Sequence, residues 1–261
     1  MANPLFQRLA LLTGVEAAEA IQKSRVIVVG IGGVGSWCAE ALIRSGVGSI
    51  MLVDSDTVGI TDFNRQVQAL SGNMGRKKTD ALKERFGSIN PSCEVVPFPH
   101  FFSKENAGLL NLSEADYIID AIDTLESKLD LIETATAAGK CFFSSMGMAW
   151  KLDPTQIRIA DIWETSGCPL ARLVRQGLKK RRFSGHFTVV YSTEKPNRGD
   201  KEGLGQNEAS AKSNAAGSRK KAVLGSAMPV TATAGMVLAS LVIRDICGKT
   251  ADSDTKGSEA S

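Results

Sequence analysis

The chain has few of the side chains on which many enzyme mechanisms depend. Its 261 residues include only two histidines, His100 and His186, and five cysteines that form no Cys-x-x-Cys pair. The odd, scattered set of cysteines argues against a zinc site and for reduced thiols in a cytoplasmic protein. Neither histidine lies near the end of a predicted strand with other reactive groups. We therefore expect both to be bystanders, which leaves no base for a histidine-dependent hydride transfer or a catalytic triad.

A strong charge of one sign and an uninterrupted membrane segment are lacking as well. The formal net charge is +3, and the hydrophobic content of 43% is ordinary for a globular protein. Glu16 and Glu19 interrupt the apolar N-terminal region, so we expect no signal peptide. Residues 222–243 carry no charge and are long enough to span a bilayer, but they contain Pro229 and two glycines. We predict instead a short strand, a loop around Pro229 and a buried helix over residues 231–246, and no membrane span.

The chain does contain a regular alternation of strand and helix patterns in its first half. The β-branched run at residues 26–29 is typical of a buried parallel strand. The same criteria predict further strands over residues 50–53, 94–98, 117–120 and 140–145. Helices are predicted between them, over residues 36–45, 78–89, 103–112 and 125–139. This alternation predicts an α/β fold of the Rossmann type, with a mostly parallel sheet and flanking helices.

The second half extends this fold with strands over residues 156–162 and 187–191 and a helix over residues 169–182. Two segments have no such patterning. Residues 195–221 are rich in Gly, Ser, Asn, Ala and Lys, and residues 249–261 are polar. Both compositions are typical of disorder. We predict one domain over residues 1–248 with a disordered insertion at 195–221, followed by a disordered tail at 249–261.

A glycine-rich turn follows the first predicted strand directly. Its glycines are Gly30, Gly32, Gly33 and Gly35. Such a turn allows a tight bend, a close approach of the backbone to phosphate and tight packing of the next helix, whose N-terminus attracts an anion. Asp54 and Asp56 follow the second strand, where an acid can bind a ribose hydroxyl. The pattern predicts binding of a mononucleotide or dinucleotide; the alternative is a glycine turn with a structural role only.

Two cations and two polar residues belong to loops that a doubly wound sheet brings to the same edge. Asn64 and Arg65 follow the second strand, Lys78 begins a predicted helix, and Asp123 follows a later strand. Cations at this edge can stabilise a triphosphate and a pyrophosphate leaving group, and a carboxylate there can hold Mg²⁺ beside phosphate oxygens. The alternative is that Arg65 and Lys78 are solvated and Asp123 caps the helix predicted from residue 125.

Several strings resemble one family of enzymes closely. They are Val-Gly-Ile-Gly-Gly-Val-Gly-Ser (29–36), Leu-Val-Asp-Ser-Asp-Thr-Val (52–58), Asn-Arg-Gln (64–66), Ile-Asn-Pro (89–91), Ile-Asp-Ala-Ile-Asp-Thr (119–124), Ser-Ser-Met-Gly (144–147), Leu-Asp-Pro-Thr (152–155) and Cys-Pro-Leu-Ala (168–171). Together they resemble the adenylating enzymes related to ubiquitin activation, and within these the tRNA threonylcarbamoyladenosine dehydratases. The resemblance covers residues 8–194 and 225–246, and it implies a single adenylation domain.

The resemblance implies a reaction that depends on ATP and Mg²⁺ and acts on a modified adenosine beside the anticodon of a tRNA that decodes ANN codons. The threonyl carboxylate would be adenylated, and its activated carbonyl would then be attacked from within the side chain, with loss of AMP. Asp54 matches the ribose acid, Arg65 and Lys78 match the phosphate cations, and Asp123 matches the aspartate linked to magnesium. Arg8 matches an arginine that reaches the ATP of a neighbouring subunit, which implies a homodimer.

Two departures from the family pattern concern the site itself. The family has Asn where this chain has Asp62, and the additional negative charge is expected to weaken ATP binding or to demand magnesium. After residue 147 the family has small residues, whereas this chain has Met148, Ala149 and Trp150. The bulkier segment is expected to change the shape of the substrate pocket.

Three alternatives stay open at the level of sequence. One is an enzyme that adenylates the C-terminus of a sulfur-carrier or ubiquitin-like protein, with Cys168 as a thiol acceptor; a sulfur-transfer protein is then a partner. Buried cysteine is the more common case for such a residue. The others are a nicotinamide-dependent dehydrogenase, which would need a catalytic partner that the chain does not offer, and a nucleotide-binding subunit without catalysis.

A basic helix favours RNA as the partner. The helix predicted over residues 169–182 carries Arg172, Arg175, Lys179, Lys180, Arg181 and Arg182 and no acid between them. Its apolar face would dock on the protein and leave the cations in solvent, where they can contact phosphates. The alternative is a helix face that is solvated and binds nothing.

Overall fold

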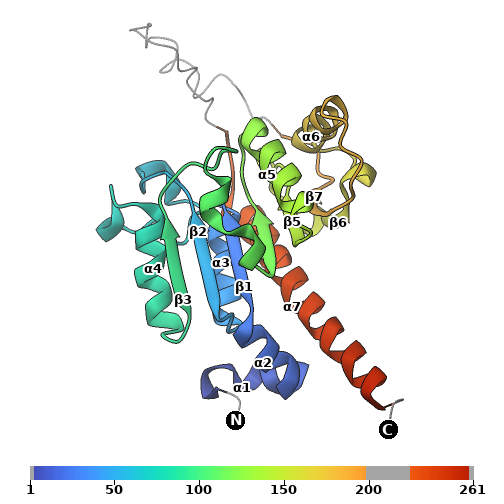
Figure 1. Ribbon diagram of the computed structural model, residues 1–261. Helices are drawn as coiled ribbons and strands as arrows, with labels where there is room; N and C mark the ends of the chain where they lie inside the picture. The colour runs from blue at the N-terminus through green and yellow to red at the C-terminus, as the bar shows by residue number, and fades with distance from the viewer. Residues whose placement is uncertain (1–2, 198–223, 259–261) are drawn as a thin grey trace, which may run out of the picture.

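The computed structural model describes residues 3–197 and 224–258, and within these residues seven strands form one sheet. Their order is β3-β2-β1-β4-β5-β7-β6 (Figure 1). All neighbouring pairs are parallel except β6 and β7. The strands are β1 (Arg25–Val29), β2 (Ser49–Val53), β3 (Glu94–Phe98), β4 (Tyr117–Asp120), β5 (Cys141–Ser145), β6 (Ile157–Asp161) and β7 (Thr188–Ser192). The Rossmann-like prediction is confirmed, including its extension by the C-terminal half.

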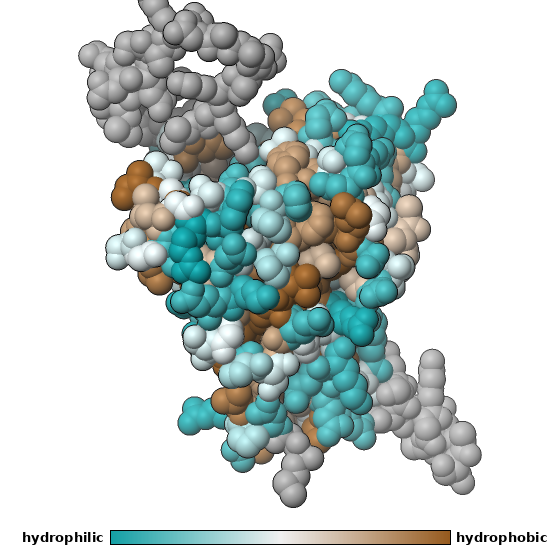
Figure 2. Space-filling model, turned by 60° about the vertical axis from the view of Figure 1, so that its left-hand side comes forward, coloured by the Kyte–Doolittle hydropathy of each residue, from teal (hydrophilic) through white to brown (hydrophobic). Residues whose placement is uncertain are grey.

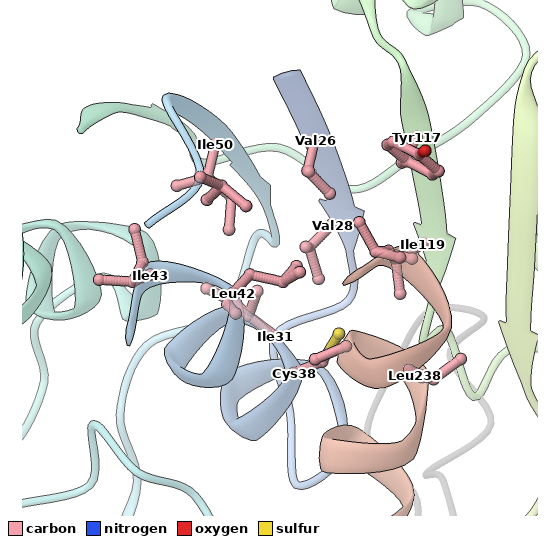
Figure 3. Close-up of a cluster of buried hydrophobic side chains, with 14 of the residues drawn as sticks. Val26, Val28, Ile31, Cys38, Leu42, Ile43, Ile50, Tyr117, Ile119 and Leu238 are labelled. Carbon is pink, nitrogen blue, oxygen red and sulfur yellow. The ribbon is translucent and has the colours of Figure 1, made fainter. Parts of the chain in front are cut away.

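The central strands contain continuous apolar runs, such as residues 26–29 of β1 and 117–119 of β4, because helices cover both faces of the sheet. On one face lie α3 (Gly35–Arg44), α4 (Lys78–Ile89) and α7 (Met228–Ser258). The helix α2 (Val15–Lys23) packs against α7 near the amino ends of the strands (Figure 1). On the other face lie α5 (Leu125–Ala137) and α6 (Pro169–Lys180). Figure 3 shows Val26 and Val28 of β1 facing Cys38 and Leu42 of α3. Burial in this core raises the pKa of the Cys38 thiol, so this cysteine is inert.

One predicted helix is absent. Residues 103–112 form two short 3-10 helices, η4 (Ala107–Leu110) and η5 (Leu112–Glu114), with an extended start. The side chain of Asn106 accepts a hydrogen bond from the Ser103 N–H and donates one to the carbonyl of Phe101. Asn111 then adopts a left-handed conformation with φ of 45°. These asparagines satisfy the backbone locally, and a continuous helix does not form.

The C-terminal helix is longer than the sequence indicated. The structure shows no strand or loop around Pro229 in its described part; instead α7 starts at Met228, and Pro229 lies in the first turn, where its missing N–H is tolerated. The predicted disordered tail at 249–261 is wrong for residues 249–258, which continue α7. Lys249 Nζ lies 2.6 Å from Asp245, and this ion pair supports the extension. Of the predicted insertion at 195–221, residues 198–221 lie outside the described residues.

Residues Met228–Ala251 of α7 are long and apolar enough to cross a membrane by length and composition. The apolar side chains that face the sheet and α3 are buried, among them Val230, Ala234, Leu238 and Val242. A Cβ on Gly235 would lie 2.5 Å from the carbonyl oxygen of Val34, so the two helices pack closely at this glycine. The apolar character of α7 therefore follows from its position in the core. In Figure 2 most of the visible surface is hydrophilic, with smaller hydrophobic patches.

Candidate functional site

The glycine turn has the sterically restricted geometry that the sequence predicted. Gly30 has φ of +83°, and a Cβ there would lie 2.8 Å from the carbonyl oxygen of Ala121. A Cβ on Gly35 would lie 1.8 Å from the carbonyl oxygen of Gly30, so only glycine lets α3 begin this close to β1. At Gly32 the nearest atom to a Cβ is 3.9 Å away. The backbone at Gly32 is therefore open to a ligand, as a phosphate-binding turn requires.

This turn opens into a cavity of about 1110 Å³ at the carboxyl ends of the strands. The cavity exceeds the usual range of roughly 300–1,000 Å³ for a single small-molecule site. Every predicted nucleotide or magnesium residue except Gly35 and Arg8 lines it. These are Gly30, Gly32, Gly33, Asp54, Asp56, Asn64, Arg65, Lys78 and Asp123. The fold thus brings together residues that are far apart in the sequence, at the place where Rossmann-like sheets bind nucleotides.

The two aspartates after β2 hold the nucleotide loop in shape. Asp54 Oδ2 accepts a hydrogen bond of 2.9 Å from the Ile31 N–H, inside the glycine turn. Asp54 Oδ1 accepts the N–H of Asp56 at 2.9 Å. Asp56 in turn lies 3.0 Å from Lys78 Nζ. Asp54 therefore links β2 to the glycine turn, which places its carboxylate beside the bound nucleotide expected there.

Asp62 is the centre of a buried polar network. Its Oδ1 accepts a hydrogen bond of 2.7 Å from the Gln66 side chain, and its Oδ2 accepts the Gly59 N–H at 3.0 Å. The Arg65 guanidinium lies 3.6 Å and Lys78 Nζ lies 3.9 Å from its carboxylate. The departure from the family pattern is thus built into the site: a negative charge sits between the two cations predicted to bind phosphate.

Lys78 is buried and Arg65 is only partly exposed, so the alternative interpretation of two solvated cations does not hold for Lys78. Lys78 is 5% exposed. The side chain of Arg65 is 26% exposed and donates to the carbonyl of Thr61 at 2.7 Å. Trp37 donates its indole N–H to the carbonyl of Arg65 at 2.8 Å, which fixes the backbone of this loop. Both cations are held at the cavity wall at a fixed distance from the glycine turn.

Asp123 does not cap α5. The N-cap residue is Thr124, which makes no side-chain cap hydrogen bond, and Thr124 Oγ1 donates to Asp123 Oδ1 at 3.4 Å. Asp123 is exposed at the cavity wall. Residues 3–197 and 224–258 contain no group of three or more His, Cys, Asp and Glu side chains that could hold a metal ion.

A buried ion pair that sequence reasoning missed supports the loop of Asp123. Lys128 Nζ lies 2.6 Å from Asp120 Oδ2, and both side chains are fully buried. Ser144 donates to the same oxygen at 2.6 Å, and Asp120 Oδ1 accepts the Ile122 N–H at 3.0 Å. The sequence contained an indication of this buried pair, because Lys128 lies three residues after Leu125 and therefore on the apolar face of the predicted helix.

Arg8 lies away from the cavity of its own chain. It is exposed on α1 (Gln7–Thr13), and the adjoining Phe6 packs against Gly46, which precedes β2. The α1 and α2 helices thus lie beyond the amino ends of the strands (Figure 1), opposite the edge that carries the cavity. Arg8 is the one predicted catalytic residue that the fold does not bring to the site.

Three further predictions concern the cavity wall. His100 follows β3 and lines the cavity, so its placement away from the reactive groups was wrong. Met148 is 4% exposed and belongs to the core, while Trp150 lines the cavity in a left-handed conformation with φ of 62°. Cys168 is 4% exposed and lies at the N-cap of α6, a position that fits the structural role rather than a thiol acceptor.

The basic helix is only partly free. Arg181 lies 2.7 Å from Glu126, 2.6 Å from Asp130 and 3.0 Å from Glu133 of α5, so its predicted role in a solvated stripe is wrong. Arg175 donates to the Thr165 hydroxyl. The other cations of the segment are exposed. They are Arg172, Lys179, Lys180 and Arg182.

A second buried lysine also lies at the cavity, and the sequence analysis did not single it out. Lys151 is 2% exposed and lines the cavity beside Trp150. Its Nζ donates to the carbonyl of Ser192 at 2.7 Å, at the end of β7. Burial lowers the pKa of the Lys151 ammonium, and the nearby Glu194 carboxylate offsets only part of this effect.

Comparison with known proteins shows the family to which this chain belongs. The ThiF family model matches residues 6–258. The tRNA threonylcarbamoyladenosine dehydratase of Bacillus subtilis is 44% identical over 191 residues, which cover 73% of this chain and 75% of that protein. The Escherichia coli protein of the same name is 35% identical over 252 residues and 93% of both chains. A crystal structure of that protein in complex with AMP superimposes with a TM-score of 0.83 at 33% identity, over 94% of this chain and 95% of that chain.

Proposed function

Because this chain belongs to the ThiF family, we propose that it is an ATP-dependent enzyme that dehydrates N6-threonylcarbamoyladenosine in tRNA. The reaction has two steps. The threonyl carboxylate attacks the α-phosphate of ATP, pyrophosphate leaves, and an acyl-adenylate forms. An atom of the ureido group then attacks the adenylated carbonyl carbon, a ring closes, and AMP leaves. The net change in the nucleoside is the loss of one water.

One observation carries the proposal: the glycine turn, a carboxylate after β2 and two held cations share one cavity that is large enough for a second ligand. The open backbone at Gly32 and the N-terminus of α3 suit phosphate. Asp54 suits a ribose hydroxyl. Arg65 and Lys78 suit the charge of the triphosphate and of the pyrophosphate leaving group. A nicotinamide-dependent dehydrogenase would have no use for this pair of cations.

Mg²⁺ belongs to the proposal as the partner of ATP. Asp123 would hold it, together with phosphate oxygens, and the ion would neutralise the charge of the triphosphate. Asp123 suits this role because it is exposed at the cavity wall near the glycine turn, and because Thr124 rather than Asp123 occupies the cap of α5.

We also propose a homodimer in which Arg8 reaches the ATP of the other subunit. The position of Arg8 beyond the amino ends of the strands supports action outside its own cavity. The neighbouring helices expose large apolar side chains that a second copy would cover, namely Leu5, Leu11, Leu12 and Val15. Leu11 and Leu12 are each 82% exposed, which is costly for apolar side chains unless a partner buries them.

The tRNA is proposed to contact Lys179, Lys180 and Arg182 at the end of α6, and we expect a cytoplasmic location, where tRNA is modified. The alternative of a protein substrate, with Cys168 as acceptor and a sulfur-transfer partner, requires an accessible thiol. Cys168 is 4% exposed and, among the described residues, is not one of those that line the cavity. The tRNA substrate is therefore the hypothesis to test first.

The experiment measures AMP and pyrophosphate formed from ATP and Mg²⁺ in the presence of threonylcarbamoylated tRNA. We expect both products only with the modified tRNA, and we expect an excess of NAD to leave the rate unchanged. Unmodified tRNA transcript is the matched control. Turnover with a small carrier protein but not with tRNA would favour the alternative substrate.

A further inference from the structure

Lys151 differs from the other deeply buried lysine, Lys128, in how its charge is compensated. Lys128 is paired with Asp120 at 2.6 Å. Lys151 has no carboxylate within ion-pair distance in the part of the chain that the structure describes; its Nζ instead donates to the carbonyl of Ser192 at 2.7 Å. A buried ammonium without a counter-ion is costly, and the neutral amine avoids that cost. A neutral amine that donates one hydrogen to Ser192 keeps its lone pair available.

The position of Lys151 along the sheet separates it from the nucleotide. The glycine turn, Asp54 and Lys78 gather around the ends of β1 and β2, and Asp123 follows β4. Lys151 lies at the end of β7, on the far side of β5 in the strand order. Beyond the nucleotide residues, the cavity is also lined by apolar side chains, among them Met146, Ala149, Trp150, Leu170 and Leu224. The amine of Lys151 thus belongs to the part of the cavity that is not lined by the predicted nucleotide-binding residues.

The backbone on both sides of Lys151 is fixed. The Trp150 N–H donates to Gly225 at 2.8 Å, and the Trp150 carbonyl accepts the N–H of Asn197 at 2.7 Å. The N–H groups of Leu152 and Asp153 donate to the Glu194 carboxylate at 3.0 and 2.9 Å. The Glu194 carboxylate therefore accepts hydrogen bonds from the backbone, and the backbone around Lys151 is held in place. Glu194 and Cys168 are the titratable groups that act on the amine.

We propose that Lys151 is the general base of ring closure, an inference that rests on the function proposed above. When the ureido oxygen or nitrogen attacks the adenylated carbonyl carbon, the bond from that carbon to the AMP oxygen breaks and a ureido N–H proton must leave. The lone pair of Lys151 Nζ accepts this proton, and the ammonium later returns it to solvent. A base must be unprotonated at working pH, and burial of this amine, which lowers its pKa, favours that state.

The test separates the two steps in single-turnover reactions with threonylcarbamoylated tRNA. Pyrophosphate release reports adenylation, and the cyclised nucleoside reports ring closure. For Lys151→Arg, which keeps a donor for Ser192 but stays protonated, we expect adenylation within about twofold of the wild type and ring closure at least about 100-fold slower. The wild-type rate of ring closure should rise with pH and level off, and the variant should lose this dependence. Lys83→Met, which removes an exposed lysine of α4, is the matched control.

Chemical rescue of a second variant keeps the test decisive if the arginine of Lys151→Arg does not fit in the buried position of Lys151. In Lys151→Ala, added primary amines should restore ring closure in proportion to their basicity, without changing adenylation. Three results would overturn the assignment and leave Lys151 as a structural link to β7. They are ring closure at the wild-type rate in Lys151→Arg, an equal loss of both steps in that variant, and no rescue by amines in a folded Lys151→Ala. If the wild type releases no pyrophosphate with the modified tRNA, the proposed function itself fails, and that result is distinct from the others.

Discussion

At the scale of single residues, we expect Asp62 to limit the affinity for ATP. Its carboxylate lies 3.6 Å from Arg65 and 3.9 Å from Lys78, so it competes with phosphate for both cations. We predict that Asp62→Asn binds ATP more tightly because the cations are released. The same change removes an acceptor from Gln66 or Gly59 and should cost about 1–3 kcal/mol of folding free energy. Calorimetric titration and thermal unfolding measure the two effects; unchanged ATP affinity would show that the cations do not contact phosphate.

We expect the opposite of Asp123, which we propose to hold Mg²⁺ and which does not cap α5. We predict that Asp123→Ala abolishes AMP formation and leaves the unfolding temperature within a few degrees of the wild type. The physical reason is that Thr124, not Asp123, occupies the N-cap of α5, so no cap is lost. Circular dichroism gives the unfolding temperature. A large loss of stability in Asp123→Ala would point to a structural role instead.

Sequence reasoning recovered these residues because their side chains follow strands whose order was predictable. The β-branched runs located β1, β2 and β4, and the topology of a doubly wound sheet then placed Asp54, Lys78 and Asp123 together. Lys151 could not be found in this way. Its environment depends on Ser192 and on residues 194–197, which only the folded chain brings to it.

At the scale of elements, α3 and α4 are joined by a buried carboxylate. Glu40 is 3% exposed and accepts hydrogen bonds of 2.6 and 2.9 Å from Arg85 and one of 2.9 Å from Arg44. Burial alone would raise the pKa of Glu40, but the bonds from Arg85 and Arg44 outweigh it and lower the pKa below its ordinary value. The network therefore stabilises the folded state above the pKa of the unfolded chain, and this contribution is lost as the pH falls.

We predict that the free energy of unfolding decreases as the pH falls from about 5, and that Glu40→Gln flattens this decrease. At neutral pH the substitution should cost about 1.5–3 kcal/mol, because hydrogen bonds to a charged acceptor are lost. Denaturant unfolding at several pH values measures both. An acid limb as steep in Glu40→Gln as in the wild type would assign the pH dependence to other carboxylates.

The exposed end of α6 carries the predicted contact with RNA. We predict that reversing Lys179 and Arg182 to Glu weakens tRNA binding and lowers the slope of log K against log salt by roughly one unit per lost phosphate contact. ATP binding should stay unchanged. The control reverses Lys83 and Arg244, which are exposed on α4 and α7. Equal effects of the two pairs would mean that net charge alone, and not α6, determines binding.

Helices and strands were predicted well where the spacing of apolar residues determines the secondary structure. They were predicted poorly where side chains form hydrogen bonds with backbone groups. The helix α4 and the strands β3 and β4 have the predicted bounds. The helix predicted over residues 103–112 failed because Asn106 and Asn111 offer local alternatives to helical hydrogen bonds. The end of α7 was missed because a polar composition does not exclude a helix that continues from a buried segment.

At the scale of the whole molecule, the position of Arg8 predicts a site that two subunits share. Each active site would combine the Asp123 of one subunit with an Arg8 from the other. We predict that Arg8→Ala and Asp123→Ala are each inactive and that a mixture regains about a quarter of wild-type activity, since half of the dimers would be mixed and each would have one intact site. Subunit exchange is checked by differently tagged chains. Exchange without recovery would contradict the shared site.

The central claim is that the cavity activates a carboxylate of a modified adenosine in tRNA with ATP and then closes a ring. The most direct measurement incubates the protein with ATP, Mg²⁺ and threonylcarbamoylated tRNA, then digests the tRNA and weighs its nucleosides by mass spectrometry. We predict a threonylcarbamoyladenosine lighter by one water, formed in step with an equal amount of AMP and absent without ATP. AMP formation without any change in the mass of the nucleoside would contradict it.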